Sequence, residues 1–380
     1  MKVFKLLFSL ALMILVGTAG AQENQFTTVT DWKGLLAQAK KENKMVFVDA
    51  YFVGCHPCKQ MDDEVFPLPA VMKQMKDNFI NVKIDFFKED IGKQLQVKYM
   101  ITGFPSFLLL NNDGQLVAKF SGYKEADEFQ GLLNDALAKS KNGFALKGFS
   151  PALDVNHADF YKAMFTERKS VDSEKLIAYL KGKDLLAEVN AVPFLMSRSL
   201  DPELSDQLLK NYSQLEALYG KDLVYARRNE IMATRIKNLI PKRNDLKFEI
   251  FLDEVKPLFS ETDWPYARLD MAEAYYYRQL KDRKAFFKYA VNHYNDDDNK
   301  IRYMAMYLYS PDVDEEEKIL FADWMIKVVS ENSTYGVLGT AANMMKQQND
   351  PEKAKLYASW GIKKAKLLNK PTKHFENILN

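Results

Sequence analysis

Two cysteines stand three positions apart in the segment Cys55-His56-Pro57-Cys58, and the chain contains no others. A thiolate attacks a disulfide and a second thiol resolves the mixed disulfide, so this spacing suits redox chemistry. A structural staple is a weaker interpretation, because a bridge across so short a loop restrains the unfolded chain little. A zinc site would need further ligands, and haem attachment would need histidine at the position of Lys59. The pattern predicts a redox-active pair that uses no metal or cofactor.

Helical and strand patterns surround the cysteines in alternation. We expect a helix from Thr30-Asp31, a strand over 45–51, a helix over 55–64, a strand over 79–86, a helix over 90–100, strands over 104–110 and 115–120, and a helix over 125–137. The near-continuous apolar run at 45–51 indicates a strand buried on both faces. Asn111-Asn112-Asp113-Gly114 is typical of a hairpin turn. The order α-β-α-β-α-β-β-α predicts an α/β domain.

The predicted elements place Cys55 at the start of a helix. Unpaired N–H groups and a partial positive charge at a helix N-terminus favour a thiolate there. Pro57 suits a first helical turn, because that position needs no N–H. His56 either adds positive charge or points to solvent, and the sequence leaves both open. Cys58, one turn further on, is expected to be less exposed and to act as the resolving thiol.

Several separated features give the chain a family resemblance over residues 27–140. They are Asp49 six residues before Cys55, the segment Cys58-Lys59-Gln60-Met61, the segment Gly103-Phe104-Pro105-Ser106, and Gly122 in Phe120-Ser121-Gly122-Tyr123. With them the chain resembles the thioredoxin superfamily, in particular exported thioredoxin-like (thiol:disulfide interchange) proteins with Lys-x-Met after the motif. The resemblance implies a central mixed sheet flanked by helices and an enzyme, a protein disulfide oxidoreductase. One departure is Gly54, which stands where the family usually has Trp.

The resemblance also implies roles for individual residues. Asp49 corresponds to the family's buried acid and would serve as base for Cys58; the alternative is a surface acid at a strand end. Pro105 corresponds to the cis-proline that lies against the disulfide, the alternative being an ordinary trans bond at a strand start. Gly103 and Phe104 would then contact substrate through their backbone. Lys59, with His56 and Pro57, belongs to the motif that tunes the pair.

The direction of electron flow is predicted from the dipeptide between the cysteines. Proline before the second cysteine, here Pro57, resembles reducing thioredoxins, whereas strongly oxidising relatives usually carry histidine there. The middle dipeptide tunes the stability of the reduced thiolate and so the potential. We expect a reductant, with an oxidant or isomerase as the alternative. The expected partners are protein substrates with disulfides and a membrane or soluble redox partner.

The first 21 residues have the pattern of a secretory signal peptide. Lys2 and Lys5 precede an apolar run, and Ala19-Gly20-Ala21 offers a cleavage site. The apolar run is shorter than the ~20 residues that span a bilayer. We therefore expect an exported protein, periplasmic or secreted, that is not embedded in the membrane after cleavage. Without those two lysines the chain has 51 basic and 51 acidic residues, which argues against nucleic-acid binding.

Beyond the α/β pattern, strand signals end and helical stretches recur. We expect a thioredoxin-like domain over 22–145 and an all-α domain over 146–380. Phe321-Ala322-Asp323-Trp324 recurs as Tyr357-Ala358-Ser359-Trp360, 36 residues later. This period is typical of tetratricopeptide-like helix pairs, and a general helical bundle is the alternative. We expect this domain to select substrates or partners or to mediate self-association; alternatively, the whole protein is a binding module with a non-catalytic thioredoxin-like scaffold.

Overall fold

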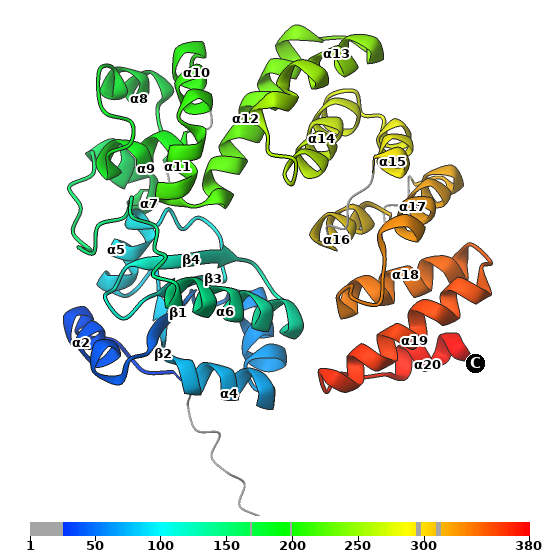
Figure 1. Cartoon of the computed structure of the whole chain (residues 1–380), viewed down its shortest axis with the longest axis horizontal. Helices are drawn as coiled ribbons and strands as arrows, with labels where there is room; N and C mark the ends of the chain where they lie inside the picture. Colours follow the sequence, from blue (N-terminus) through cyan, green and yellow to red (C-terminus); the bar gives the residue numbers. More distant parts are fainter. Residues whose placement is uncertain (1–25, 168, 198–199, 294–297, 309–312) are drawn as a thin grey trace, which may run out of the picture.

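The computed structural model describes residues 26–167, 169–197, 200–293, 298–308 and 313–380, so the expected leader at 1–21 lies outside the described residues. Residues 26–141 form a sheet domain (Figure 1). Its elements are α2 (Trp32–Glu42), β1 (Met45–Tyr51), α3 (His56–Gln60), the π-helical turn η1 (Met61–Val65), α4 (Pro69–Asn78), β2 (Phe79–Asp85), α5 (Asp90–Lys98), β3 (Ser106–Leu110), β4 (Leu116–Ser121) and α6 (Ala126–Lys141).

The sheet has the strand order β2-β1-β3-β4 and is mixed, as predicted. Strand β1 pairs in parallel with β2, with Asp49 opposite Lys83, and antiparallel with β3, with Asp49 opposite Phe107. Strands β3 and β4 form an antiparallel hairpin across the predicted turn. Because β1 has a neighbouring strand on each side, the segment that follows it leaves the sheet at the end of a central strand.

The helix that carries the cysteines ends within one residue of the predicted Glu64, because η1 continues α3 to Val65. A separate helix that was not predicted, α4, begins at Pro69. Pro67 and Pro69 explain the break, because proline cannot donate the backbone hydrogen bond of a helix interior but fits the first turn. Strand β3 likewise begins one residue after Pro105, at Ser106.

Alternating residues of β1 point to opposite faces of the sheet and enter two different cores. Met45 and Phe47 face α4, α6 and the cysteine-bearing helix, and the Phe47 ring lies 5.6 Å from that of Phe107 and 5.8 Å from that of Phe129. Val46 and Val48 face α2 and α5. Helices therefore cover both faces of the sheet.

The remainder of the described chain is helical. Its elements are α7 (Asp159–Thr166), α8 (Ser173–Leu180), α9 (Glu188–Met196), α10 (Pro202–Lys210), α11 (Tyr212–Tyr219), α12 (Lys221–Leu239), α13 (Asp245–Val255), η2 (Lys256–Leu258), α14 (Trp264–Ala272), η3 (Glu273–Gln279), α15 (Arg283–Asn292), α16 (Asp298–Tyr307), α17 (Glu315–Val328), α18 (Tyr335–Gln347), α19 (Pro351–Leu367) and α20 (Lys373–Leu379). These helices form an arc that starts at the sheet domain and curves back toward α4 and α6 (Figure 1).

The first helices of this arc are packed on the sheet domain. The Leu146 N–H donates to the Leu116 carbonyl oxygen at 2.7 Å, which attaches the connecting segment to β4. The Tyr161 hydroxyl donates to the Val97 carbonyl oxygen of α5, also at 2.7 Å. Helices α7 to α12 contribute to the same hydrophobic cluster as Val46 and Val48. The sheet and the helices that follow it thus share one core.

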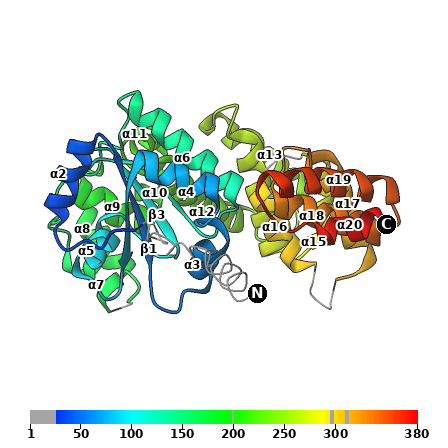
Figure 2. The ribbon, with the colours of Figure 1, turned by 90° about the horizontal axis from the view of Figure 1, so that it is seen from below.

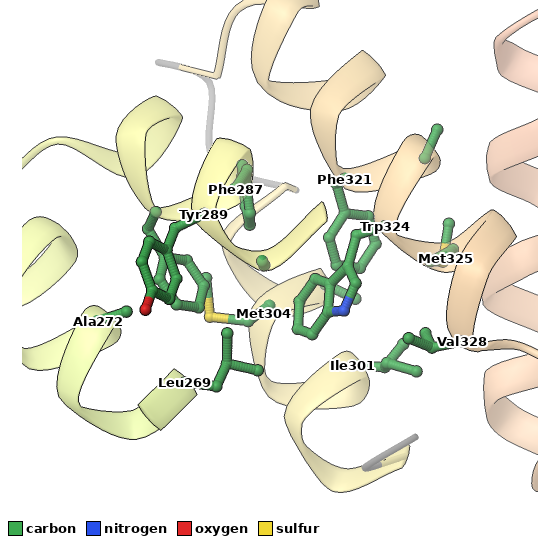
Figure 3. Close-up of a cluster of buried hydrophobic side chains, with 14 of the residues drawn as sticks. Leu269, Ala272, Phe287, Tyr289, Ile301, Met304, Phe321, Trp324, Met325 and Val328 are labelled. Carbon is green, nitrogen blue, oxygen red and sulfur yellow. The ribbon is translucent and has the colours of Figure 1, made fainter. Parts of the chain in front are cut away.

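The last helices have a core of their own (Figure 3). Trp324 is fully buried at its centre, its ring 5.9 Å from that of Phe321. The corresponding Tyr357 on α19 is buried too, whereas Trp360 is only partly buried. Both tryptophans pack within the protein, and the helix-pair repeat stays a prediction.

The last helices lie beside the sheet domain (Figure 2). Charged contacts connect this far end of the arc to the sheet domain. The buried Glu125, just before α6, accepts hydrogen bonds from the Gly336 N–H of α18 at 2.9 and 3.0 Å to its two carboxylate oxygens. Arg302 of α16 pairs with Glu128 at 3.2 Å. We call these contacts the clasp. They hold the C-terminal helices beside the loop that follows β4.

Replacing Glu125 with alanine is expected to loosen the clasp. The Gly336 N–H loses its charged acceptor, which costs about 1.5–3 kcal/mol of local stability. Hydrogen exchange of the first-turn amides of α18 should become faster by about tenfold or more. Asp135→Ala is the matched control, because Asp135 lies on α6 but pairs only with Lys139 at the surface. Equal exchange in both variants would contradict this role of Glu125.

Candidate active site

The two cysteines form a disulfide with their Cα atoms 5.3 Å apart. Cys55 is the N-cap residue of α3, and the Cys58 backbone N–H donates to the Cys55 Sγ at 3.2 Å. Cys55 is 7% exposed and Cys58 is 3% exposed. A hydrogen bond to the charged form of a group favours that form, so this N–H will stabilise a Cys55 thiolate when the pair is reduced. Of the two cysteines, Cys58 is the more buried, as expected from the sequence.

The other motif residues take different positions around the pair. His56 is exposed and Pro57 lies in the first turn of α3. The Lys59 Nζ pairs with the Asp63 carboxylate at 2.8 Å on the surface. Met61 is fully buried, and its sulfur accepts a hydrogen bond from the Lys124 N–H at 3.4 Å. Met61 thereby attaches the cysteine-bearing helix to the loop beyond β4.

Asp49 is buried on the sheet face that packs against the cysteine-bearing helix. It is 1% exposed, and it shares its face of β1 with Met45 and Phe47, which contact the same cluster as Met61. Burial raises the pKa of Asp49 to about 6, against the attraction of Lys83, which lowers it. A carboxyl group with this pKa changes charge close to neutral pH, so it is suited to proton transfer. The structure thus places Asp49 inside the protein, not at a surface strand end.

Lys83 and Asp62 complete the charged group, and the sequence analysis did not single them out. The Lys83 Nζ lies 3.1 Å from the Asp49 carboxylate and also pairs with Asp62 of η1. Burial lowers the pKa of Lys83, but pairing with both carboxylates outweighs it and the net pKa is raised. Lys83 was detectable as a charged residue inside the otherwise largely apolar strand β2, which ends at Asp85, whereas Asp62 stands in an acidic run with no such signal.

The loop before β3 lies beside the end of β1 that leads to the cysteines. The pairing of Ala50 with Ser106 brings Pro105 to this edge, and the Phe104–Pro105 peptide bond is cis. The Pro105 carbonyl oxygen accepts a hydrogen bond from the Gly122 N–H at 2.8 Å. Gly103 is exposed, with open space where a side chain would project.

Taken together, the site holds the Cys55–Cys58 disulfide and a buried acid of raised pKa around one end of the sheet. Among the residues that the structure describes, no group of three His, Cys, Asp or Glu is arranged to hold a metal ion. In the same described residues, no helix is both long and apolar enough to cross a bilayer. The arrangement is suited to making and breaking a disulfide between Cys55 and a second sulfur.

Comparison with known proteins agrees with this geometry. The family model described as a thioredoxin-like domain matches residues 33–137. Thioredoxin-1 of Drosophila yakuba is 32% identical over 112 residues, which cover 30% of this chain and 92% of that protein.

Two longer proteins match the same part of the chain. The protein disulfide-isomerase of Ricinus communis is 25% identical, with 32% of this chain and 24% of that protein covered. The thiol:disulfide interchange protein DsbD of Pseudomonas fluorescens is 30% identical, with 26% of this chain and 18% of that protein covered. The chain therefore spans about a quarter or less of these two relatives. It spans nearly the whole of the insect thioredoxin, and by that match and the fold of its sheet domain the chain belongs to the thioredoxin superfamily.

Proposed function

We propose that this protein is a thiol-disulfide oxidoreductase that reduces disulfides in other proteins. The observation that carries the proposal is the Cys55–Cys58 pair, with the Cys58 N–H directed at the Cys55 sulfur and the buried Asp49 on the sheet face beneath their helix. The matches to a thioredoxin and to a protein disulfide-isomerase support the same chemistry. The reaction takes place between sulfur atoms, so the proposal includes no cofactor besides the cysteine pair.

In the first step, the Cys55 thiolate attacks one sulfur of the substrate disulfide. The substrate S–S bond breaks, a mixed disulfide forms with Cys55, and the other substrate sulfur leaves as a thiolate that takes a proton from water. The Cys58 N–H favours the ionised form of Cys55 before the attack. The thiolate, not the thiol, is the form that attacks.

In the second step, Asp49 acts as the base for Cys58. Its ionised carboxylate accepts the Cys58 proton, and the resulting thiolate attacks the Cys55 sulfur, which releases the second substrate thiol. Two electrons have then passed from the cysteine pair to the substrate, and the pair is a disulfide. An external dithiol donor, membrane-bound or soluble, must reduce the pair again before the next cycle.

The compartment and the helical part complete the proposal. The expected leader at 1–21 supports an exported protein, periplasmic or secreted, because protein disulfides persist in such compartments. The helices after residue 145 pack on the sheet domain and return to it through the clasp. We assign them the selection or positioning of protein substrates, and self-association is a second possible use of their surface.

Replacing Cys58 with serine is expected to trap the intermediate. Cys55 can still attack, but nothing resolves the mixed disulfide, so a covalent adduct with a disulfide-bonded peptide accumulates and is visible by mass spectrometry. Cys55→Ser is the control and should form no adduct. Adduct formation through Cys58 in that control would reverse the assigned roles. Absence of turnover in the wild type would favour the scaffold interpretation.

Replacing Asp49 with asparagine is expected to remove one inflection from the pH dependence of the rate at which Cys58 resolves the mixed disulfide. Above pH 6 the wild-type carboxylate is ionised and accepts the Cys58 proton, whereas below pH 6 it is protonated and the resolving step slows. In the variant this step should be slower by about 10²-fold at pH 7.5, the lower end of what a general base contributes. Rapid-mixing measurement of mixed-disulfide decay tests this. Glu89→Gln is the control, because it also removes a carboxylate of the sheet domain, one that accepts a hydrogen bond from the Asp85 N–H just before α5. An unchanged inflection in Asp49→Asn would rule Asp49 out.

The reduction potential of the Cys55–Cys58 pair tests the direction of electron flow. Proline before the second cysteine supports a reduction potential near that of thioredoxin, about −270 mV. Equilibration of the mature protein in graded thiol buffers, with alkylation of free thiols, gives this value. A potential of about −120 to −180 mV would instead identify an oxidant or isomerase.

A further inference from the structure

A groove with a volume of about 770 Å³ opens between the sheet domain and the first helices that follow it. The sheet domain contributes Phe52 and Phe104, and the helical part contributes Met164, Phe165, Val171 and Met196. We call this the redox groove. Its size is within the range of about 300–1,000 Å³ found for ligand pockets. It is large enough to hold several side chains of a bound segment.

Phe52, which lines the redox groove, connects it to the disulfide, although neither cysteine is part of the lining. The Cys55 N–H donates to the Phe52 carbonyl oxygen at 3.1 Å, so Phe52 is one turn before the attacking sulfur. The Phe52 and Phe104 rings meet edge to face at 5.4 Å, and Phe104 precedes the cis-proline. The exposed Gly103, which also lines the groove, leaves room for a chain to pass. A polypeptide bound at Cys55 can therefore extend over these residues without crossing solvent.

The opposite wall belongs to the helical part and is held in place by the shared core. The Tyr161 hydroxyl fixes α7, which carries Met164 and Phe165, to the Val97 carbonyl of the sheet domain. The Arg227 Nε donates to the Leu195 carbonyl oxygen at 3.1 Å, which anchors the end of α9 beside Met196. The wall is therefore preorganised, and its two methionines have flexible side chains that adapt to different apolar partners.

The chemistry of the lining selects an apolar occupant. The six named residues are all partly buried, so each keeps some apolar surface open to the groove. The cation at the rim, Lys169, is already paired with Glu167. The other polar residues of the lining, Gln96, Thr102, Ser170 and Ser173, are uncharged, and the six apolar residues supply the surface that an occupant gains most from covering.

We propose that the redox groove binds the extended segment of a substrate protein next to the attacked cysteine, with an aliphatic or aromatic side chain against Met164, Val171 and Met196. This inference rests on the proposed function and names its substrate class: disulfides flanked by apolar sequence. Such segments are buried in folded proteins, so the occupant is an unfolded or partly folded chain. The helical part thereby contributes substrate contacts directly at the redox site.

Three probes test this proposal in the full mature chain. Two synthetic peptides, each closed by one disulfide, differ only in having Leu and Phe or Ser and Gly beside the attacked cysteine; oxidised glutathione is the third. The wild type should react with the apolar peptide about tenfold faster in kcat/KM than with the polar one. Met164→Ser should remove most of this advantage and Val171→Ser part of it. The preference is the ratio of the two peptide rates within each variant, and the circular dichroism spectrum of each variant checks that it folds.

The control is Met306→Ser, which removes a methionine that is 71% exposed on α16 and lies outside the groove. It should keep the full preference for the apolar peptide. Equal rates for the two peptides in the wild type, or unaltered preference in Met164→Ser, would overturn the groove but leave the proposed function standing. Lack of reaction with all three probes would refute the proposed oxidoreductase function. In that case, calorimetry with the reduced apolar peptide and the Cys55→Ser variant tests the redox groove separately: binding supports it and no binding contradicts it.

Discussion

The pairing of β1 on both of its edges is the constraint on which the rest of the structure depends. Parallel pairing with β2 brings Lys83 opposite Asp49, and antiparallel pairing with β3 brings the Pro105 loop to the end of β1. The cysteine motif follows directly from that end. A shift of one residue in either register would turn Asp49 to the other face of the sheet and separate it from the helix that carries Cys58.

Asp49 combines two opposing effects that the fold holds in balance. Burial disfavours its charged form and raises its pKa, while Lys83 favours the charge and keeps the pKa near 6. Complete isolation would leave the acid protonated at neutral pH, and full solvation would make it too weak a base. Lys83 is also paired with Asp62 on the cysteine-bearing helix, so the same charges that tune Asp49 connect the central strand with that helix.

The helical part is joined to the sheet domain at both ends of its arc, and the two connections differ in kind. At the start, Tyr161 and its neighbours bury apolar surface against the sheet, which makes a rigid wall for the redox groove. At the end, the clasp uses Glu125 and Arg302. Apolar burial holds the wall of the redox groove in position, whereas charged hydrogen bonds close the other end of the arc.

Local structure could be predicted from residues close together in the chain: the apolar run 45–51 predicted β1 residue for residue, and the spacing of Cys55 and Cys58 predicted their disulfide chemistry. Residue types and their periodicity are enough for these predictions, because a strand or a cysteine pair of this kind depends on residues that are near neighbours in the chain. The sequence did not predict α4, the Asp49–Lys83–Asp62 charges, the core shared by the sheet and α7–α12, or the wall that Met164 and Met196 form. These depend on residues far apart in the chain, and only tertiary packing decides which buried charges and apolar faces meet.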